Sequence, residues 1–103
     1  KGIGASFGKV SARACVVNSK EDLKNFRKSD VIVTKYVDQE LFKNINLSHV
    51  SGIVTEFGGV LCHFAINARE NRIPCVVGIR DVTSIIRTGE NVLLNGDTGE
   101  VII

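Results

Sequence analysis

The sequence predicts an α/β domain with a largely parallel central sheet and additional antiparallel strands at its two ends. Short β-branched runs at 31–34, 53–55 and 75–77 alternate with stretches whose apolar residues have helical spacing. Such alternation is typical of parallel strands joined by right-handed helical crossovers. The first stretch, 9–17, alternates apolar residues as a strand does, and Asn95-Gly96-Asp97 is a strong hairpin turn. Both ends of the chain are therefore expected to add antiparallel strands.

The N-terminal half begins with a glycine-rich segment that lacks the spacing of a dinucleotide-binding fingerprint, so we expect an edge strand with a turn. Ser19 is expected to cap a short helix, and Asp38 a longer one, because their side chains can accept hydrogen bonds from unpaired amides. The expected elements are, in order, an edge segment at 2–8, a strand at 9–17, a short helix from 18, a strand at 31–34 and a helix at 36–46.

The C-terminal half contains the sharpest local signals. Pro74 enforces the end of a helix near Asn71-Arg72, and Asp81 is expected to cap a short helix. The expected elements are, in order, a strand at 53–55, a glycine turn at 56–59, a helix that begins near 62, a strand at 75–78, a helix at 81–86 and a hairpin at 92–103.

Length and composition limit the kinds of function and partner that the sequence is expected to have. The 103 residues fit one domain, and the 13 basic and 11 acidic residues leave a net charge of +2 with no basic cluster, which argues against a nucleic-acid partner. No apolar run reaches membrane-spanning length, so no membrane partner is expected. Three cysteines without close spacing suggest reduced thiols in the cytoplasm. Methionine is absent, so residues 1–103 are expected to be a domain excised from a longer multidomain chain.

The most informative stretch is the glycine pair Gly58-Gly59, which is followed by Cys62 and His63 where a helix should begin. Glycines let backbone amides approach a ligand, and a helix N-terminus favours an anion such as phosphate. A neutral imidazole there is a good nucleophile, so His63 is the candidate acceptor of a phosphoryl group. The alternative is a histidine that merely caps the helix, but the glycine pair favours the functional interpretation.

Three further side chains are candidates for supporting roles. Cys62 would cap the helix or touch the phosphate; a Cys–His nucleophile pair is disfavoured because adjacent helical residues point about 100° apart. Thr55 would donate to the phosphate or the ring, with ordinary strand-end hydrogen bonding as the alternative. Arg69 would pair with a phosphate held by another domain, or would form a surface ion pair. No recognisable spacing of ligands predicts a metal site.

The sequence resembles the phosphohistidine domain of enzymes that use phosphoenolpyruvate: phosphoenolpyruvate synthase, pyruvate phosphate dikinase, enzyme I of the sugar phosphotransferase system and rifampicin phosphotransferase. The resemblance extends from the start of the chain to its end. It is carried by Thr55-Glu56-Phe57-Gly58-Gly59, Cys62-His63, Ala65-Ile66, Ala68-Arg69-Glu70, Ile73-Pro74 and Val76-Val77-Gly78, with Gly4-Ala5-Ser6, Gly8-Lys9-Val10, Gly89, Asn95-Gly96 and Gly99-Glu100-Val101 at the two ends.

The resemblance implies a swivelling β/β/α domain of three layers. His63 would be phosphorylated on Nε2 and would carry the group between an ATP-grasp-like nucleotide-binding domain and a phosphoenolpyruvate/pyruvate barrel domain, or to a carrier protein. This domain would bind no cofactor itself; Mg²⁺ and ATP or phosphoenolpyruvate would belong to the partner domains.

The sequence departs from the family pattern beside the histidine. Leu61 replaces a common threonine that is a regulatory phosphorylation site in the dikinases, so that regulation is not expected. Phe64 and Asn67 replace small and aliphatic residues, so the substrate cannot be carried over from the family. Two other hypotheses stay open: a swivel or interaction domain without catalysis, and the histidine domain of a rifampicin phosphotransferase or an enzyme I-type protein.

Overall fold

A computed structural model describes residues 3–6, 8–17, 20–35, 49–57 and 70–102 of the chain. Within these residues, seven strands form sheets in the order β1-β5-β4-β3-β2-β6-β7. The elements are β1 (Ile3–Ser6), β2 (Lys9–Val16), the 3-10 helix η1 (Lys20–Asn25), β3 (Asp30–Thr34), β4 (Val50–Thr55), β5 (Cys75–Val77), α3 (Val82–Ile85), β6 (Asn91–Asn95) and β7 (Glu100–Ile102).

The strand directions confirm the predicted α/β class. Strands β2, β3, β4 and β5 are mutually parallel along the sheet, whereas β1 is antiparallel to β5. At the other end, β6 is antiparallel to both β2 and β7. β3, β4 and β5 carry the apolar β-branched runs, as the pattern indicated. β2 has no such run and differs from the expectation, because it is parallel to β3 and antiparallel to β6.

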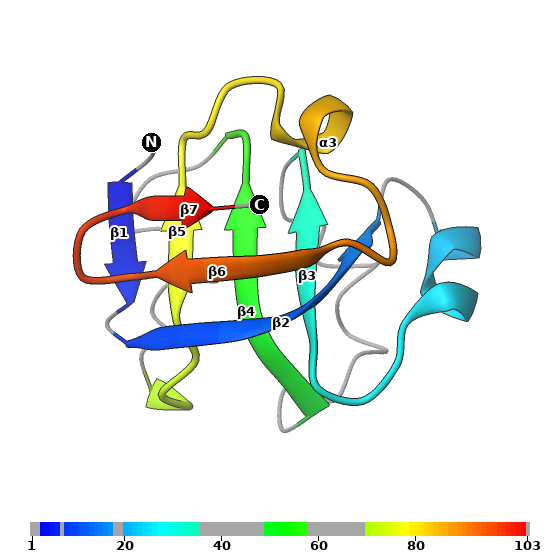
Figure 1. The fold of residues 1–103 in the computed structure, drawn as a ribbon, viewed down its shortest axis with the longest axis horizontal. Coiled ribbons are helices and arrows are strands. Elements are labelled where there is room, and N and C mark those ends of the chain that lie inside the picture. The colour runs from blue at the N-terminus through cyan, green and yellow to red at the C-terminus, as the bar shows by residue number, and fades with distance from the viewer. Residues whose placement is uncertain (1–2, 7, 18–19, 36–48, 58–69, 103) are drawn as a thin grey trace.

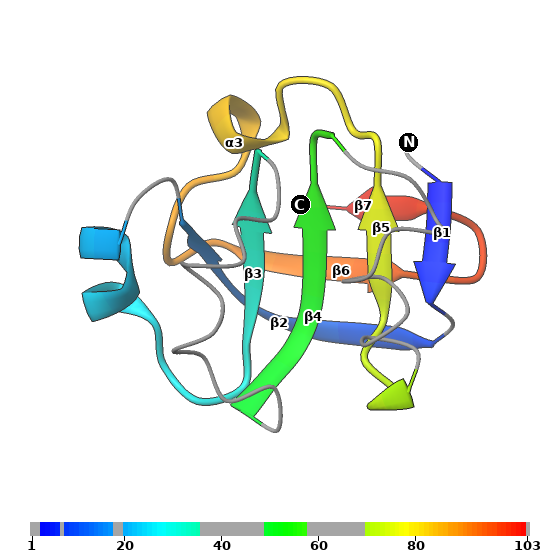
Figure 2. The same ribbon diagram turned by 180° about the vertical axis from the view of Figure 1, so that it is seen from behind.

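Strand β2 belongs to both layers of the molecule. Its first part, Lys9 to Arg13, pairs with β6, and its last part, Ala14 to Val16, pairs with β3. Strands β2, β6 and β7 therefore cross in front of β1, β5, β4 and β3 in Figure 1 and behind them in Figure 2. β2 is thus shared by the two β layers and joins them.

The core between the two layers is almost entirely aliphatic. Its members are buried side chains from both layers together with one from α3 and one from the residue that follows α3: Ala14, Val31, Val33, Val54, Val76, Val82, Ile86, Val92 and Leu94. The opposite face of the parallel sheet is also buried, since Ile32 and Ile53 are inaccessible to solvent. A sheet buried on both faces explains why these strands read as unbroken apolar runs.

The helices expected to form the third layer of the β/β/α architecture fall outside the described residues and stay predictions. These are the helix expected at 36–46 with its Asp38 cap and the helix that begins near His63. Glu70 is helical and Asn71-Arg72 form a turn, so the predicted end of that second helix is confirmed. Arg72 has a φ of 57°, a left-handed conformation that terminates helices.

The short helix predicted near 18–22 is a 3-10 helix at Lys20–Asn25, and the expected cap Ser19 lies outside the described residues. The hairpin at the other end is confirmed in detail. The Asn95 side-chain oxygen accepts hydrogen bonds from the amides of Asp97 at 2.9 Å and Thr98 at 3.3 Å. The turn is therefore stabilised by hydrogen bonds between the Asn95 side chain and the backbone amides that follow it, which is a common role of asparagine in turns.

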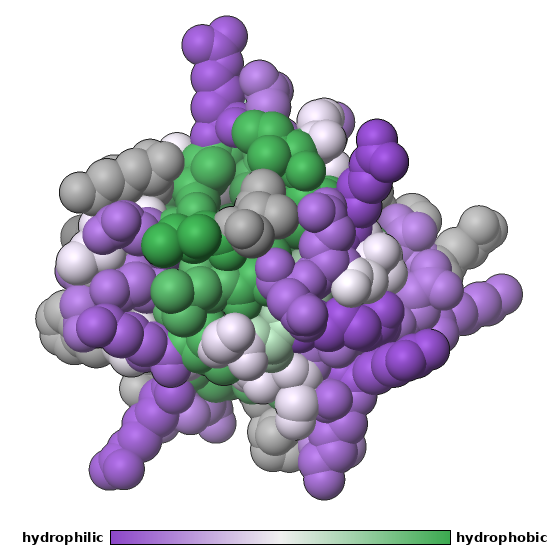
Figure 3. Space-filling view, viewed as in Figure 1, coloured by the Kyte–Doolittle hydropathy of each residue, from purple (hydrophilic) through white to green (hydrophobic). Residues whose placement is uncertain are grey.

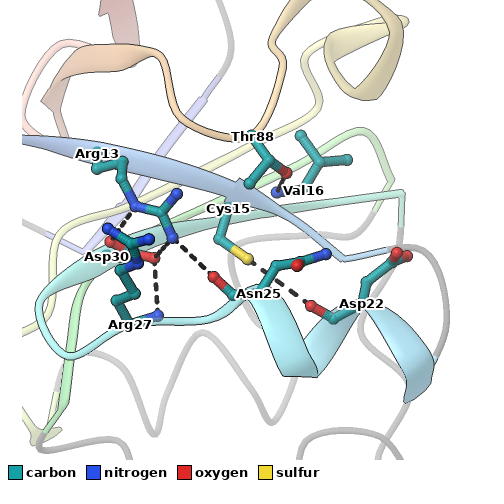
Figure 4. A network of polar contacts seen from close by, with 8 residues as sticks. All are labelled: Arg13, Cys15, Val16, Asp22, Asn25, Arg27, Asp30 and Thr88. Atoms are coloured by element: carbon teal, nitrogen blue, oxygen red, sulfur yellow. Dashed lines mark hydrogen bonds and ion pairs between the residues drawn. The ribbon is translucent and has the colours of Figure 1, made fainter.

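A buried arginine–carboxylate pair ties β2 to the start of β3 (Figure 4). Arg13 donates from Nε and Nη2 to the two carboxylate oxygens of Asp30, at 3.2 and 2.8 Å, and from Nη2 to the carbonyl of Asn25 at 2.7 Å. Asp30 also accepts from the Arg27 amide at 2.9 Å. These bonds satisfy the carboxylate of Asp30, of which only 3% is exposed.

Cys15 lies beside this network, with Sγ 4.0 Å from the Asp22 carbonyl. Burial, followed by the negative charge of Asp30, raises the pKa of the Cys15 thiol, and the positive charge of Arg13 offsets part of that rise. The thiol is thus held in its neutral form, which is the unreactive one.

We predict that Gly4→Ala destabilises the fold. A Cβ at Gly4 would lie 2.0 Å from the carbonyl oxygen of Gly96, in the loop of the β6–β7 hairpin, and neither backbone can yield easily. The expected loss is about 1–3 kcal/mol of unfolding free energy, measured by urea denaturation. Ser11→Ala on the exposed face of β2 is the control, with an expected change within about 0.5 kcal/mol. Equal stability of the two variants would contradict the close packing of the hairpin on β1.

We predict that Cys15 makes stability fall in alkaline solution. Because its pKa is raised on folding, the neutral thiol contributes stability below the unfolded pKa of about 8.5, and that contribution is lost as pH rises above it. Urea unfolding from about pH 8 to about pH 10 should therefore show a steeper loss of stability for the wild type than for Cys15→Ala. Parallel curves for the two proteins would show that Cys15 does not titrate as described.

Candidate functional site

The candidate site lies where three parallel strands end. Strands β3, β4 and β5 point the same way, and the segment Thr55-Glu56-Phe57 leaves the end of β4 at this edge, near α3 (Figure 1). The carboxyl edge of parallel strands is where open α/β sheets bind ligands. Of the predicted site residues, Thr55 is described, whereas Gly58, Gly59, Cys62, His63 and Arg69 lie outside the described residues and stay predictions.

Backbone hydrogen bonds set the path of the chain as it leaves β4. The amides of Glu56 and Phe57 both donate to the carbonyl of Lys35, at 3.1 and 2.8 Å. The carbonyl of Thr55 accepts from the Ile79 amide at 3.1 Å. The segment is thus bound on one side to the end of β3 and on the other to the loop after β5, and the chain enters position 58 from a defined direction.

Thr55 is a buried residue with an unsatisfied hydroxyl. Its side chain lies on the same face of β4 as Ile53, opposite Val54, which packs in the core between the two layers. Residue 55 is inaccessible to solvent, and Oγ1 has no hydrogen-bond partner within the part of the chain that the structure describes. A buried unpaired hydroxyl costs free energy and calls for an explanation.

Glu56 has a positioning role that the sequence did not reveal. It is only 9% exposed, and its Oε2 accepts hydrogen bonds from the amide of Thr83, at 3.2 Å, and from the Thr83 hydroxyl. These bonds tie the segment before Gly58 to the first turn of α3. The partners are 27 residues apart, so no local pattern could have indicated them.

The predicted cap of α3 is therefore wrong in its chemistry, although the helix itself is confirmed. Asp81 occupies the N-cap position but has a φ of 57°, a left-handed conformation, and its side chain makes no capping hydrogen bond. The Thr83 amide, which a capping side chain would normally accept from, is bound by Glu56 instead. The carboxylate of Glu56, which is distant in the sequence, therefore caps α3 in place of the carboxylate of Asp81.

Comparisons with known proteins are consistent with this geometry. Residues 26–99 match the family model described as PEP-utilising enzyme, mobile domain. The chain belongs to that family. The matched range includes both the described Thr55–Phe57 segment and the stretch that contains His63.

Relatives and a solved structure agree with the family. The chain is 36% identical over 101 residues to a probable phosphoenolpyruvate synthase of Methanothermobacter thermautotrophicus and 36% identical over 103 residues to a rifampicin phosphotransferase of Bacillus cereus. These matches cover 98% and 97% of the chain but only 14% and 11% of the relatives. An NMR structure of Enzyme I matches with a TM-score of 0.68 and 32% identity, over 78% of this chain and 32% of that one.

Within the described residues, no three His, Cys, Asp or Glu side chains gather as they would around a metal ion. None of the helices in that part of the chain has the length and apolar character of a membrane-spanning segment.

We predict that removing the Glu56 carboxylate destabilises the domain and that a neutral acceptor largely replaces it. Glu56→Ala removes the acceptor for the Thr83 amide and hydroxyl, and loss of a helix cap costs about 0.5–2 kcal/mol. Glu56→Gln retains an oxygen acceptor, so its loss should be smaller. Urea denaturation measures both, with Glu100→Ala on the exposed end of β7 as control. If Glu56→Ala were as stable as the Glu100→Ala control, the hydrogen bonds from Thr83 to Glu56 would make no measurable contribution to the stability of the domain.

Proposed function

We propose that this domain accepts a phosphoryl group on His63 and passes it between active sites of partner domains in phosphoenolpyruvate-linked phosphoryl transfer. The observation that carries the proposal is membership of the mobile-domain family over 26–99, a range that contains Gly58-Gly59 and His63. The names of the relatives, a phosphoenolpyruvate synthase and a rifampicin phosphotransferase, support the reaction class of a phosphotransferase.

The proposed step is a displacement at phosphorus. The lone pair of the neutral His63 Nε2 attacks the phosphorus of the donor, an N–P bond forms, and the P–O bond to the donor breaks. The electron pair leaves with the donor oxygen, and Nδ1 keeps the proton of the ring. Phosphoryl transfer depends mainly on positioning and on stabilisation of charge, so the glycine amides and the start of the helix would supply most of what this domain must provide.

The described residues support this role by the way they hold the entrance to the glycine turn. Glu56 and Phe57 bond to Lys35, and Thr55 bonds to Ile79, so the turn begins from a fixed position. The Thr55 hydroxyl, which has no hydrogen-bond partner among the described residues, precedes Gly58-Gly59 in the sequence and is suited to donate to the phosphate or to the ring. In the proposal, Cys62 supports the phosphate from the helix start and Arg69 meets a phosphate presented by a partner.

The domain requires catalytic partners. The chain spans 14% and 11% of the two relatives, and we propose that the nucleotide-binding and phosphoenolpyruvate-binding domains lie elsewhere in a longer protein. Mg²⁺ and ATP or phosphoenolpyruvate would be held there and not on this domain. We place the protein in the cytoplasm, where the Cys15 thiol, which forms no disulfide, stays reduced.

We predict that His63→Ala abolishes acid-labile, base-stable labelling of the complete protein by radiolabelled phosphoenolpyruvate or ATP, because no other group would accept the phosphoryl. Cys62→Ser should retain the label and the activity, since the thiol is not the nucleophile. Scintillation counting after acid and base treatment measures the label. Label that persists in His63→Ala would overturn the proposal, and unchanged activity of that variant would instead favour a swivel domain without catalysis.

A further inference from the structure

Four large apolar side chains are exposed in the described residues, and they lie in two places. Leu93 and Ile102 are cross-strand partners on the outer side of β6 and β7, 40% and 53% exposed. Figure 3 shows hydrophobic residues gathered over these strands, and nothing in the structure shows what covers them. Phe57 and Ile85, 63% and 56% exposed, lie instead at the edge that carries the candidate site.

Phe57 and Ile85 belong to two segments that are bonded to each other. Phe57 follows Glu56, and Ile85 is two residues after Thr83, whose amide lies 3.2 Å from the Glu56 carboxylate. Successive Cα atoms are about 3.8 Å apart, so both apolar side chains start within about 10 Å of this contact. Figure 1 shows the end of β4 and α3 together at the same edge of the molecule. A single partner surface of ordinary size, about 800 Å² on each side, would span both.

The backbone beneath Phe57 is already ordered. Its amide bonds to Lys35 at 2.8 Å, and the neighbouring carboxylate is bonded to α3. An exposed aromatic on an ordered backbone loses little conformational freedom on binding, and this favours a role as an anchor in an interface.

We propose that Phe57 and Ile85 form the apolar centre of the surface that docks onto the catalytic domain that phosphorylates His63. This inference rests on the proposed carrier function. The donor must reach His63, six residues after Phe57, and the chain spans only 14% and 11% of its relatives, so the donor's active site is on another part of the protein. A donor that docks onto this edge covers Phe57, which is 63% exposed there.

Charges at the same edge indicate the chemistry of the partner. Lys35 is exposed next to Phe57 in the hydrogen-bonded segment, and Arg80 is exposed in the loop after β5. The side chains of Arg80 and its neighbour Asp81 form an ion pair, with Nε 3.8 Å from Oδ2, and both are exposed to solvent. Because Asp81 offsets the charge of Arg80, the charge of Lys35 decides the expectation: the docking face of the donor should present an apolar pocket with an acidic group near Lys35.

The test separates docking from the chemistry of the histidine. The complete protein is labelled in two ways: by its own donor domain with radiolabelled phosphoenolpyruvate, and by radiolabelled phosphoramidate, a small donor that needs no docking. The double variant Phe57→Ala/Ile85→Ala should lose about tenfold or more in the rate of donor-driven labelling, as expected for removal of interface anchors. Its labelling by phosphoramidate should stay within about twofold of wild type. Leu93→Ala, an exposed apolar residue on the other face, is the matched control and should change neither rate.

Each other outcome overturns the inference. Wild-type donor-driven labelling of the double variant would show that the two side chains do not dock, and it would leave the carrier function standing. Loss of both kinds of labelling in a variant that keeps its thermal unfolding transition would show that Phe57 shapes the phosphate site instead. Failure of wild-type His63 to be labelled by either donor would remove the proposed function and the docking surface with it.

Discussion

The burial of β4 on both faces is the constraint on which the rest of the structure depends. Val54 packs in the core between the two layers, while Ile53 and Thr55 lie on the opposite face, and all three are inaccessible to solvent. A strand in this position has no exposed face on which to carry polar chemistry. Polar side chains stand at its carboxyl end, where Thr55 and Glu56 precede Gly58-Gly59 in the sequence.

The end of a buried strand needs partners for its polar groups, and at β4 those partners hold the segment Thr55–Phe57 in place. The Glu56 carboxylate is almost fully buried and gains its hydrogen bonds from Thr83, and the backbone amides next to it bond to Lys35. The satisfaction of buried polar groups thus connects β3, β4 and α3 at one edge. In the proposed carrier, the same bonds hold the glycine turn and the exposed Phe57 in fixed positions for a partner.

The proposed function separates two tasks between domains. Phosphoryl transfer needs a well-placed nucleophile and charge stabilisation, which one glycine turn and one histidine can provide on a small domain. Activation of the donor is left to partners, in agreement with the small share of the relatives that this chain covers. The specificity of the whole reaction then depends on docking surfaces as well as on the site itself.

The sequence alone determined the strands and the fold class, and the site that it predicts after β4 stays a prediction at Gly58, Gly59 and His63. The β-branched runs, the Asn95 turn and the end of a helix before Pro74 are local features, because hydrogen bonds within a few residues and side-chain alternation specify them. Only the tertiary structure decided that β2 joins both layers and that Glu56, and not Asp81, meets the first turn of α3. Those decisions come from contacts between residues far apart in the chain, and such contacts leave no periodic or local mark in the sequence.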